Sequence, residues 1–527
     1  MAATEAEASK RMRADVSDEY LSTSGTMEVA PSWSRFVPGP DPKYRFKSLS
    51  PSVAQMGVVG CGCACLMISG INVALMGSVS STPSYLACTG LTDGSDHTQL
   101  LIGVINAMYF VGVVMGALII GPVSDKVGRR RAIFTSGLYA MVVIPIFASL
   151  QGFGWALVLR FLNGLATGAF DSVGLNWSAE SIEAKYRGRA IGIQLCFAAL
   201  GASQSYFLVY GISKATNSEV LWRFPIAYQC VFVLLVCTIV WILPESPRWL
   251  VRVGLFDESR DVLLAMKGGS EVGPDDIAKT VDDDILTIRQ ALQEEILHSS
   301  STTYLSMLFM EDRYKTARRT WSALFVQFAT QAMVGAGFVS GYGVKIFETG
   351  GWSSDMASLL SGIGIVIQAI FGFVGAMWAD QIGRRRAFIW GAFIGCILLA
   401  FVGMCGYFVS RSTENDPALA RQYSSAVIAL VMIWSAVYGS TWLWAPFTYP
   451  TEIFPSRSRT RGSSIGIVGL GLGSFFTNMI SPYMFQALGS NAMFLICGLS
   501  FVVAVMSYLW LPETAGKSLE EINSLYD

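Results

Sequence analysis

The chain contains the charged stretch Asp125-Lys126-Val127-Gly128-Arg129-Arg130-Arg131, which lies between two long apolar runs and recurs as Asp380-Gln381-Ile382-Gly383-Arg384-Arg385-Arg386. The two copies are 255 residues apart (380 minus 125), which is close to half of the 527-residue chain. A charged turn that recurs at half the chain length, each time between apolar runs, indicates two halves with the same order of membrane helices.

The composition also indicates a membrane protein, because 52% of the residues are hydrophobic and only 14% are charged. Runs of about 20 apolar residues, each long enough to cross about 30 Å of hydrocarbon, follow one another. Since lipid offers no partners to backbone polar groups, these runs should be helices. We predict an all-α membrane protein with about twelve transmembrane helices in two pseudo-symmetric six-helix bundles. The expected spans are 55–77, 98–121, 132–151, 155–176, 189–212, 224–243, 321–345, 356–378, 387–409, 425–447, 464–487 and 489–511.

A polar stretch of about 75 residues separates the two sets of spans. Within it, apolar residues recur every three or four positions from Ile277 to Ile296, which predicts an amphipathic helix on the membrane surface. Such a helix serves either as a tether between the halves or as a regulatory docking site, and we favour the tether. The expected parts are a cytoplasmic tail (1–52), a six-helix bundle (53–250), a cytoplasmic linker (251–319), a second bundle (320–511) and a short cytoplasmic tail (512–527).

Lys and Arg gather in the short loops after the second, fourth, eighth and tenth expected spans, whereas loop 78–97 has none. Because cytoplasmic loops are enriched in these residues, the four loops should face the cytoplasm, and an even number of spans places both termini there. The sequence shows no cleavable signal segment. We therefore expect an integral, multi-pass protein, with the plasma membrane as its location because no organelle signal is evident.

The sequence shows no catalytic or metal-binding constellation. Its two histidines, His97 and His298, lie in loops on opposite sides, and no nucleophile or ligand cluster falls within one span. We therefore expect no enzymatic activity, no cofactor and no metal. A formal net charge of −1 does not imply nucleic acid as a partner, and we expect a monomer.

Several longer motifs occur in a fixed order around the polar stretch and in the last third of the chain. The chain resembles the sugar porter family of the major facilitator superfamily from about residue 55 to its end, and this resemblance implies the major facilitator fold. The motifs that carry it are Trp222-Arg223-x-Pro225-x-x-x-Gln229, Pro244-Glu245-Ser246-Pro247-Arg248-Trp249-Leu250, Glu452-Ile453-Phe454-Pro455-x-Arg457-x-Arg459 and Pro512-Glu513-Thr514-x-Gly516-Lys517. Glu180, followed by Arg187-Gly188-Arg189, completes the pattern.

The resemblance implies a cytoplasmic latch in which the glutamates after spans four and ten pair with the Arg-rich turns after spans two and eight. Such a latch would hold the two bundles together at the cytoplasmic side. The alternative is that these charges only anchor helix ends at the membrane surface. The residues concerned are Asp125, Arg129, Glu180, Arg187, Glu245, Asp380, Arg384, Glu452 and Arg459.

Ionisable residues are rare within the expected spans, so each one needs an explanation. Arg160 matches the family arginine that faces span one, where proton-coupled relatives have an aspartate and this chain has Asn72. Asn72 carries no titratable proton, so the resemblance implies facilitative transport. Asp171, eleven residues after Arg160, is either a proton site or an ordinary acid hydrated near the inner mouth, and we favour the second interpretation.

Sugar recognition needs amides that match hydroxyl groups and an aromatic wall for the apolar ring face. The resemblance implies a substrate site with Asn72, Gln194, Gln331, Tyr342, Trp444 and Phe447. Other positions depart from the family pattern, because Ala332 and Gly337 stand where an amide is usual. The expected pocket therefore has fewer amides and more room than one for a hexose.

We predict an alternating-access transporter for a sugar, polyol or related polar organic solute, of the facilitative kind, with the solute and the lipid bilayer as its partners. Two alternatives remain. One is a proton-coupled symporter or an exporter of a non-sugar organic metabolite, for which protons would be a further partner. The other, ranked last, is a sugar sensor that does not transport.

Overall fold

Six long helices form the N-terminal half of the chain in the computed structural model. They are α2 (Pro51–Val79), α4 (Asp96–Val127), α5 (Arg129–Ala148), α6 (Phe153–Ser181), α7 (Ala184–Ser213) and α8 (Val220–Ile242), and the short α3 (Pro83–Thr89) joins α2 to α4. The structure describes residues 50–80, 82–182, 184–215, 218–267, 274–297, 304–311, 315–412, 416–454, 459–515 and 517. The tail predicted at 1–52 therefore lies almost wholly outside the described residues, as does most of the one predicted at 512–527.

The C-terminal half repeats this order of helices with two of them broken. Its elements are α13 (Thr316–Ala332), α14 (Ala336–Thr349), α15 (Ser354–Met377), α16 (Ala379–Ile382), α17 (Arg384–Ser412), α18 (Pro417–Ser440), α19 (Ala445–Ile453), α20 (Arg459–Leu488), the 3₁₀ turn η2 (Gly489–Asn491) and α21 (Ala492–Trp510). The spans expected as continuous helices at 321–345 and 425–447 are thus interrupted, at 333–335 and 441–444.

The number of membrane crossings agrees with the prediction. Eleven helical stretches of the described chain are long and apolar enough to cross a membrane. The last of them, Ser464–Trp510, has 47 residues, about 70 Å at 1.5 Å per residue, and it contains both α20 and α21 joined by η2. Because a bilayer core is only about 30 Å thick, this stretch crosses twice and the total is twelve.

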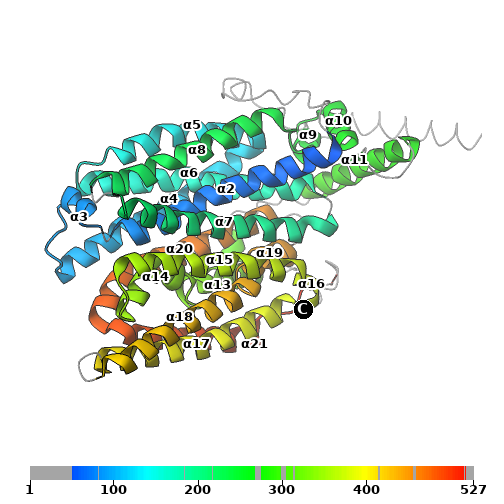
Figure 1. Ribbon diagram of the computed structural model, residues 1–527. Coiled ribbons are helices and arrows are strands. Elements are labelled where there is room, and N and C mark those ends of the chain that lie inside the picture. Colours follow the sequence, from blue (N-terminus) through cyan, green and yellow to red (C-terminus); the bar gives the residue numbers. More distant parts are fainter. Residues whose placement is uncertain are drawn as a thin grey trace, which may run out of the picture.

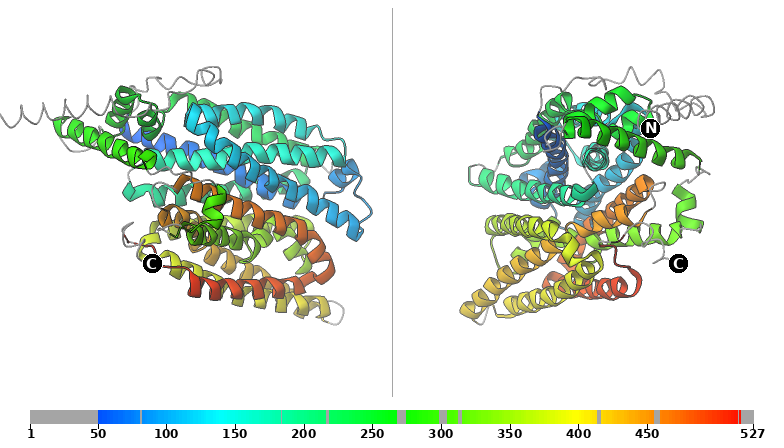
Figure 2. Two further views of the ribbon diagram at one scale, coloured as in Figure 1. Left: turned by 180° about the vertical axis from the view of Figure 1, so that it is seen from behind. Right: turned by 90° about the vertical axis from the view of Figure 1, so that its right-hand side faces the viewer.

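The two halves lie side by side with their helices running in the same general direction (Figure 1). The view along the helices shows them as two separate bundles (Figure 2, right). The halves pack most closely where α4 meets α20 and α7 meets α15. A substrate path between the halves would therefore be bordered by these helices.

Four helices connect the halves, the short α9 (Pro247–Arg252), α10 (Phe256–Lys267) and α12 (Tyr304–Phe309) and the longer α11 (Pro274–Leu297). α11 covers the stretch for which the apolar spacing predicted an amphipathic helix. α9 to α11 lie at the same end of the molecule as α16, whereas α3 lies at the other end (Figure 1). We call the end that carries the charged turns at Gly128 and Gly383 the basic end, and the end with α3 the opposite end.

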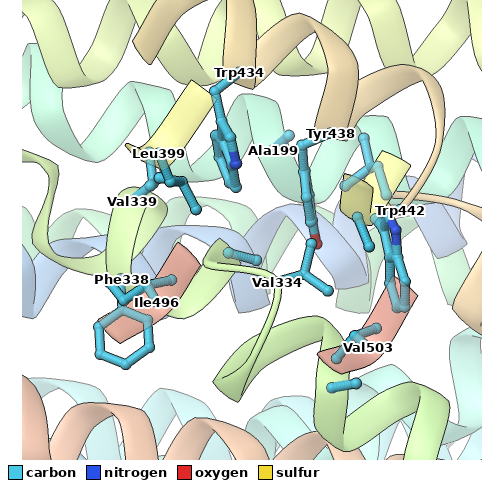
Figure 3. Close-up of a cluster of buried hydrophobic side chains, with 14 of the residues drawn as sticks. Ala199, Val334, Phe338, Val339, Leu399, Trp434, Tyr438, Trp442, Ile496 and Val503 are labelled. Atoms are coloured by element: carbon cyan, nitrogen blue, oxygen red, sulfur yellow. The ribbon is translucent and has the colours of Figure 1, made fainter. Parts of the chain in front are cut away.

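Both broken helices have an identifiable local cause. Gly335 adopts a φ of +102°, a left-handed conformation that ends α13 and that a side chain would strain. Beyond the end of α18, Trp442 packs into a buried cluster with Trp434 and Tyr438 (Figure 3). The rings of Trp434 and Tyr438 stack with their centres 5.2 Å apart. Val334, from the first break, belongs to the same cluster. Breaks of this kind are tolerated in a membrane only where protein surrounds them or where they border a cavity.

Close helix packing in the N-terminal half requires small residues. A Cβ added at Gly70 of α2 would lie 1.8 Å from the carbonyl oxygen of Ala198 in α7. We expect Gly70→Ala to separate these helices and to cost about 1–3 kcal/mol, seen as a lower melting temperature of the purified protein in detergent. Gly60→Ala on the same helix is the control, because nothing lies within 4 Å of its added Cβ. Equal melting temperatures for the two variants would contradict this account of the packing.

Candidate functional site

A buried carboxylate caps the charged turn in the N-terminal half. Glu245, which follows α8, accepts hydrogen bonds from the backbone N–H groups of Arg129 (3.0 Å), Arg130 (3.2 Å) and Ser246 (2.9 Å). A Cβ at Gly128, whose φ is +97°, would lie only 2.6 Å from this carboxylate. Burial raises the pKa of the Glu245 carboxyl, and the Arg130 side chain and the backbone donors oppose that rise. The negative charge therefore lies on the N-terminus of α5, where the helix dipole favours it.

The C-terminal half repeats this arrangement at the start of α17. Glu513 accepts hydrogen bonds from the backbone N–H groups of Arg384 (2.8 Å), Thr514 (3.1 Å) and Ala515 (3.1 Å). A Cβ at Gly383, with a φ of +81°, would lie 2.5 Å from the Glu513 carboxylate. Glu513 was not among the predicted site residues, although Pro512-Glu513-Thr514 matches Pro244-Glu245-Ser246 with a threonine in place of the serine.

The ion pairs implied by the family resemblance form within each half. Arg129 binds both carboxylate oxygens of Glu180, at 3.0 and 2.8 Å, and lies 3.1 Å from Asp125. Arg384 binds Glu452 at 2.6 Å. Each pair thus joins a charged turn to a helix end of the same half, the end of α6 for Arg129 and the end of α19 for Arg384.

Each of these glutamates also accepts a hydrogen bond from the hydroxyl residue that follows a capping carboxylate. Ser246 donates to Glu180 at 2.5 Å, and Thr514 donates to Glu452 at 2.6 Å. Turn, cap and ion pair therefore form one connected unit in each half. The side chains of Arg187, Asp380 and Arg459, also predicted for the latch, lie outside the described residues, and the role of the latch between the halves stays a prediction.

Within the described chain, Arg160 and Asn72 form no hydrogen bond with each other. The Asn72 side-chain oxygen accepts a hydrogen bond of 2.6 Å from Asn163, one turn beyond Arg160 on α6. The Arg160 guanidinium lies 4.4 Å from the ring centre of Tyr109 in α4 and is 1% exposed. In the described part of the chain, Arg160 forms no ion pair with a carboxylate. The span-one position is therefore engaged in an amide–amide contact rather than in a charge pair.

Asp171 lies between α6 and α2. One of its carboxylate oxygens accepts a hydrogen bond of 2.9 Å from the Ser69 hydroxyl, and the other has no partner in the described chain. Among the described lysines and arginines, none forms an ion pair with it. An acid within a membrane helix and without a cation is costly, about 2.5–3.5 kcal/mol on insertion scales, which makes Asp171 a functional candidate.

The predicted amides differ in where they lie. Gln194 is fully buried inside the N-terminal half next to Gly62, and neither polar atom of its amide has a hydrogen-bond partner in the described chain. Gln331 is half-buried at the end of α13, next to the first break. The structure therefore brings these two residues to opposite halves without joining them.

Of the three predicted aromatic residues, Trp444 and Phe447 lie at the second break, and Phe447 packs against the other half. Trp444 is 1% exposed and donates its indole N–H to the carbonyl of Ser440 at 2.9 Å, inside its own half. Phe447 packs against a buried cluster of Leu66, Ile191 and Leu195 from the N-terminal half. Phe447 therefore lies at the interface between the halves, and its role as an aromatic wall stays a prediction.

Tyr342 connects the halves toward the opposite end. It kinks α14, with φ −127° and ψ 26°, and its hydroxyl accepts a hydrogen bond from Asn106 of α4 (3.2 Å) while donating to the carbonyl of Asn478 (3.0 Å). Tyr206 of α7 donates to the carbonyl of Ser340 in α14 at 2.9 Å. These contacts close the space between the halves on this side.

Two further contacts join the halves near the opposite end. Lys214 forms an exposed ion pair with Asp355 of α15, and Gln486 donates to the carbonyl of Gly94 at 3.4 Å. The closure on this side therefore extends from the buried tyrosines to the surface loops.

A cavity of about 50 Å³ remains between the halves on the side of the basic end. It lies one turn closer to that end than the predicted amides, because Ile191 and Gln327 line it and Gln194 and Gln331 do not. Of the predicted substrate residues, Phe447 alone contributes. The polar groups that line the cavity are Ser172, Asn176, Gln327, Thr451 and Ser464. The sequence offered one signal for this set, because Gln327 stands four residues before Gln331 on the same helix face.

A duplicated bundle of twelve helices, with a cavity of polar and apolar side chains between its halves, defines a membrane transporter of the alternating-access kind. The chain belongs to the sugar porter family of the major facilitator superfamily, because the family model described as "Sugar (and other) transporter" matches residues 58–526. Among similar proteins, the MFS transporter fmqE of Aspergillus fumigatus is 26% identical, over 88% of this chain and 84% of that protein.

The arabinose-proton symporter of Bacillus subtilis is 25% identical, over 83% of this chain and 89% of that protein. The sugar transporter STL1 of Saccharomyces cerevisiae is also 25% identical, over 82% and 74%. A solved structure of the proton:xylose symporter XylE with 6-bromo-6-deoxy-D-glucose has a TM-score of 0.73 at 19% identity, covering 90% of this chain and all of that one. At that identity the likeness supports the fold alone.

The buried ion pair at the basic end should contribute more stability than the exposed one at the opposite end. We expect Glu180→Gln to lower the free energy of unfolding by about 1–3 kcal/mol, because it weakens charged hydrogen bonds to the buried Arg129. Asp355→Asn is the matched control and should cost about 0–1 kcal/mol, since Lys214 and Asp355 are both about half exposed. Thermal unfolding of both variants in detergent measures the difference, and a larger loss for Asp355→Asn would overturn the assignment.

Proposed function

We propose that this protein moves a sugar, a polyol or a related polar organic solute across a membrane by alternating access. The observation that carries the proposal is one-sided closure. Hydrogen bonds from Tyr206 and Asn106 close the halves at the opposite end, whereas a cavity lined by both polar and apolar side chains remains between them toward the basic end. Family membership and the similarity to sugar transporters support the solute class.

The proposed orientation has the basic end and both termini in the cytoplasm. It rests on the arginines of the two charged turns, which gather at that end. The plasma membrane is the proposed location, a monomer the proposed state, and no catalysis is part of the proposed function.

The proposed mode is facilitative, since the span-one position cannot exchange a proton. Asn72 and Asn163 hold each other through their amides, and neither side chain changes its charge. Transport would then follow the solute gradient alone. The cytoplasmic latch would hold the basic end together during the part of the cycle in which the opposite end is open.

A second candidate, supported by Asp171, is proton-coupled symport or the export of a non-sugar organic metabolite. Its carboxylate has one unpartnered oxygen and contacts Ser69 of α2, a helix that contributes to the interface between the halves. A group of this kind can bind and release a proton when the halves move. A non-transporting sensor has no specific observation in its favour.

Uptake of radiolabelled D-glucose, D-xylose, L-arabinose and glycerol into liposomes that contain the purified protein tests the proposal. We expect one of these solutes to equilibrate at a rate that an imposed proton gradient does not change. We also expect Asp171→Asn to retain at least about half of the rate, since a carboxylate without a coupling role can be replaced by its isostere.

The control is Ser69→Ala, which removes the hydrogen bond to Asp171 and keeps the carboxylate. Accumulation that requires the gradient, persists in Ser69→Ala and disappears in Asp171→Asn would establish the second candidate instead. If none of the solutes moves, a sugar or polyol is not the substrate.

A further inference from the structure

The cavity toward the basic end contains a polar group that the fold leaves unsatisfied. Gln327 of α13 is 2% exposed, and its amide N–H donates to the carbonyl of Pro446 at 2.8 Å. This bond fixes the orientation of the side chain. Among the residues that the structure describes, none donates a hydrogen bond to the buried amide oxygen of Gln327. A buried acceptor without a partner is destabilising, so its position at the cavity calls for a functional reason.

The other half contributes a second amide to the same cavity. Asn176 of α6 lines it, is partly exposed and makes no hydrogen bond within the described chain. Ser172, one turn away on α6, lines it as well, and the ring of Phe447 supplies an apolar surface. Amides from both halves and one aromatic ring therefore converge on a space that no side chain fills.

The lining indicates the chemical class of the ligand. None of the residues that line the cavity is charged, which fits an uncharged solute. A fixed amide oxygen accepts a hydrogen bond from a hydroxyl, and the free amide of Asn176 can both donate and accept. Phe447 offers a face for the C–H side of a sugar ring.

We propose that this cavity is a second solute-binding site, on the cytoplasmic side of the predicted mid-membrane residues, in which Gln327 and Asn176 bind hydroxyl groups of an uncharged polyol or sugar. The proposal rests on the function proposed above. It assigns a binding role to two residues that lie outside the set implied by the family resemblance.

The small size of the cavity determines from which side of the membrane a solute can reach this site. About 50 Å³ holds one or two water molecules, so a solute enters only when the halves separate at the basic end. Gln327 and Asn176 belong to different halves, and the contacts of Tyr342 and Tyr206 separate both from the opposite end. The site should therefore act on solute that arrives from, or leaves to, the cytoplasm.

Sided transport kinetics test this proposal. KM is measured for D-glucose, D-xylose and L-arabinose in right-side-out and inside-out membrane vesicles, for the wild type and for Gln327→Leu. For the probe that the wild type carries, we expect Gln327→Leu to raise KM about two- to tenfold when solute is presented to the cytoplasmic face, the loss of one neutral hydrogen bond. KM at the other face should change less than about twofold.

Gln229→Leu is the matched control, because Gln229 of α8 is also buried with an amide that has no partner in the described chain, but it lies outside the cavity. Asn176→Leu provides an independent variant from the other half and should reproduce the effect of Gln327→Leu. The melting temperature of each variant reports whether it folds, and Ser172→Ala replaces any variant that does not.

The possible outcomes separate this inference from the proposed function. A rise in KM at the cytoplasmic face alone, in variants of both halves, supports the second site. Equal changes at both faces, or no change, would overturn it while leaving sugar transport intact. A wild-type protein that carries none of the probes would remove both proposals.

Discussion

The carboxylates of Glu245 and Glu513 lie on the first N–H groups of α5 and α17, and each connects the start of one helix to the segment that follows a distant one. The donors in these contacts are backbone N–H groups that follow a glycine with a left-handed φ. A side chain introduced elsewhere cannot take the place of these donors. The same two segments supply Ser246 and Thr514 to the glutamates that bind Arg129 and Arg384. Each half is thereby closed into one body at the basic end, so the halves can move relative to each other without losing their internal packing.

The interface between the two halves has a different character. In the N-terminal half every crossing is one continuous helix, whereas the C-terminal half has breaks at 333–335 and 441–444. Gln327 and Phe447 flank these breaks and line the cavity, and Tyr342 lies beyond the first of them. The N-terminal half therefore offers a stiff surface, and the C-terminal half carries the places where backbone geometry can change at low cost.

The features that could be predicted from the sequence are those built from residues that are rare in a membrane protein. Charged residues are few, so the repeated turns stand out and could be predicted, whereas the pairing of Arg129 with Glu180 was implied by the family resemblance. The two helix breaks could not, because Gly335 is one of 52 glycines and its left-handed conformation depends on the packing around it. The polar lining of the cavity was also not predicted, because Ser172 and Thr451 are common residue types in membrane helices. The direction in which they face depends on how the halves pack. The substrate roles of Gln194 and Trp444 stay predictions, and both residues lie inside their own halves.

Tyr206, Asn106 and Gln486 each make a hydrogen bond across the halves. These bonds also affect which conformation of the transport cycle is more populated without solute. At about 1 kcal/mol each, three such bonds weight the population of conformations by roughly a hundredfold in favour of the arrangement closed at the opposite end. A solute arriving from that side meets a binding-competent fraction of about one per cent, and its apparent affinity is reduced by the same factor. The protein would then take up and release its solute with unequal apparent affinities on the two sides, even if the intrinsic contacts of the site were identical.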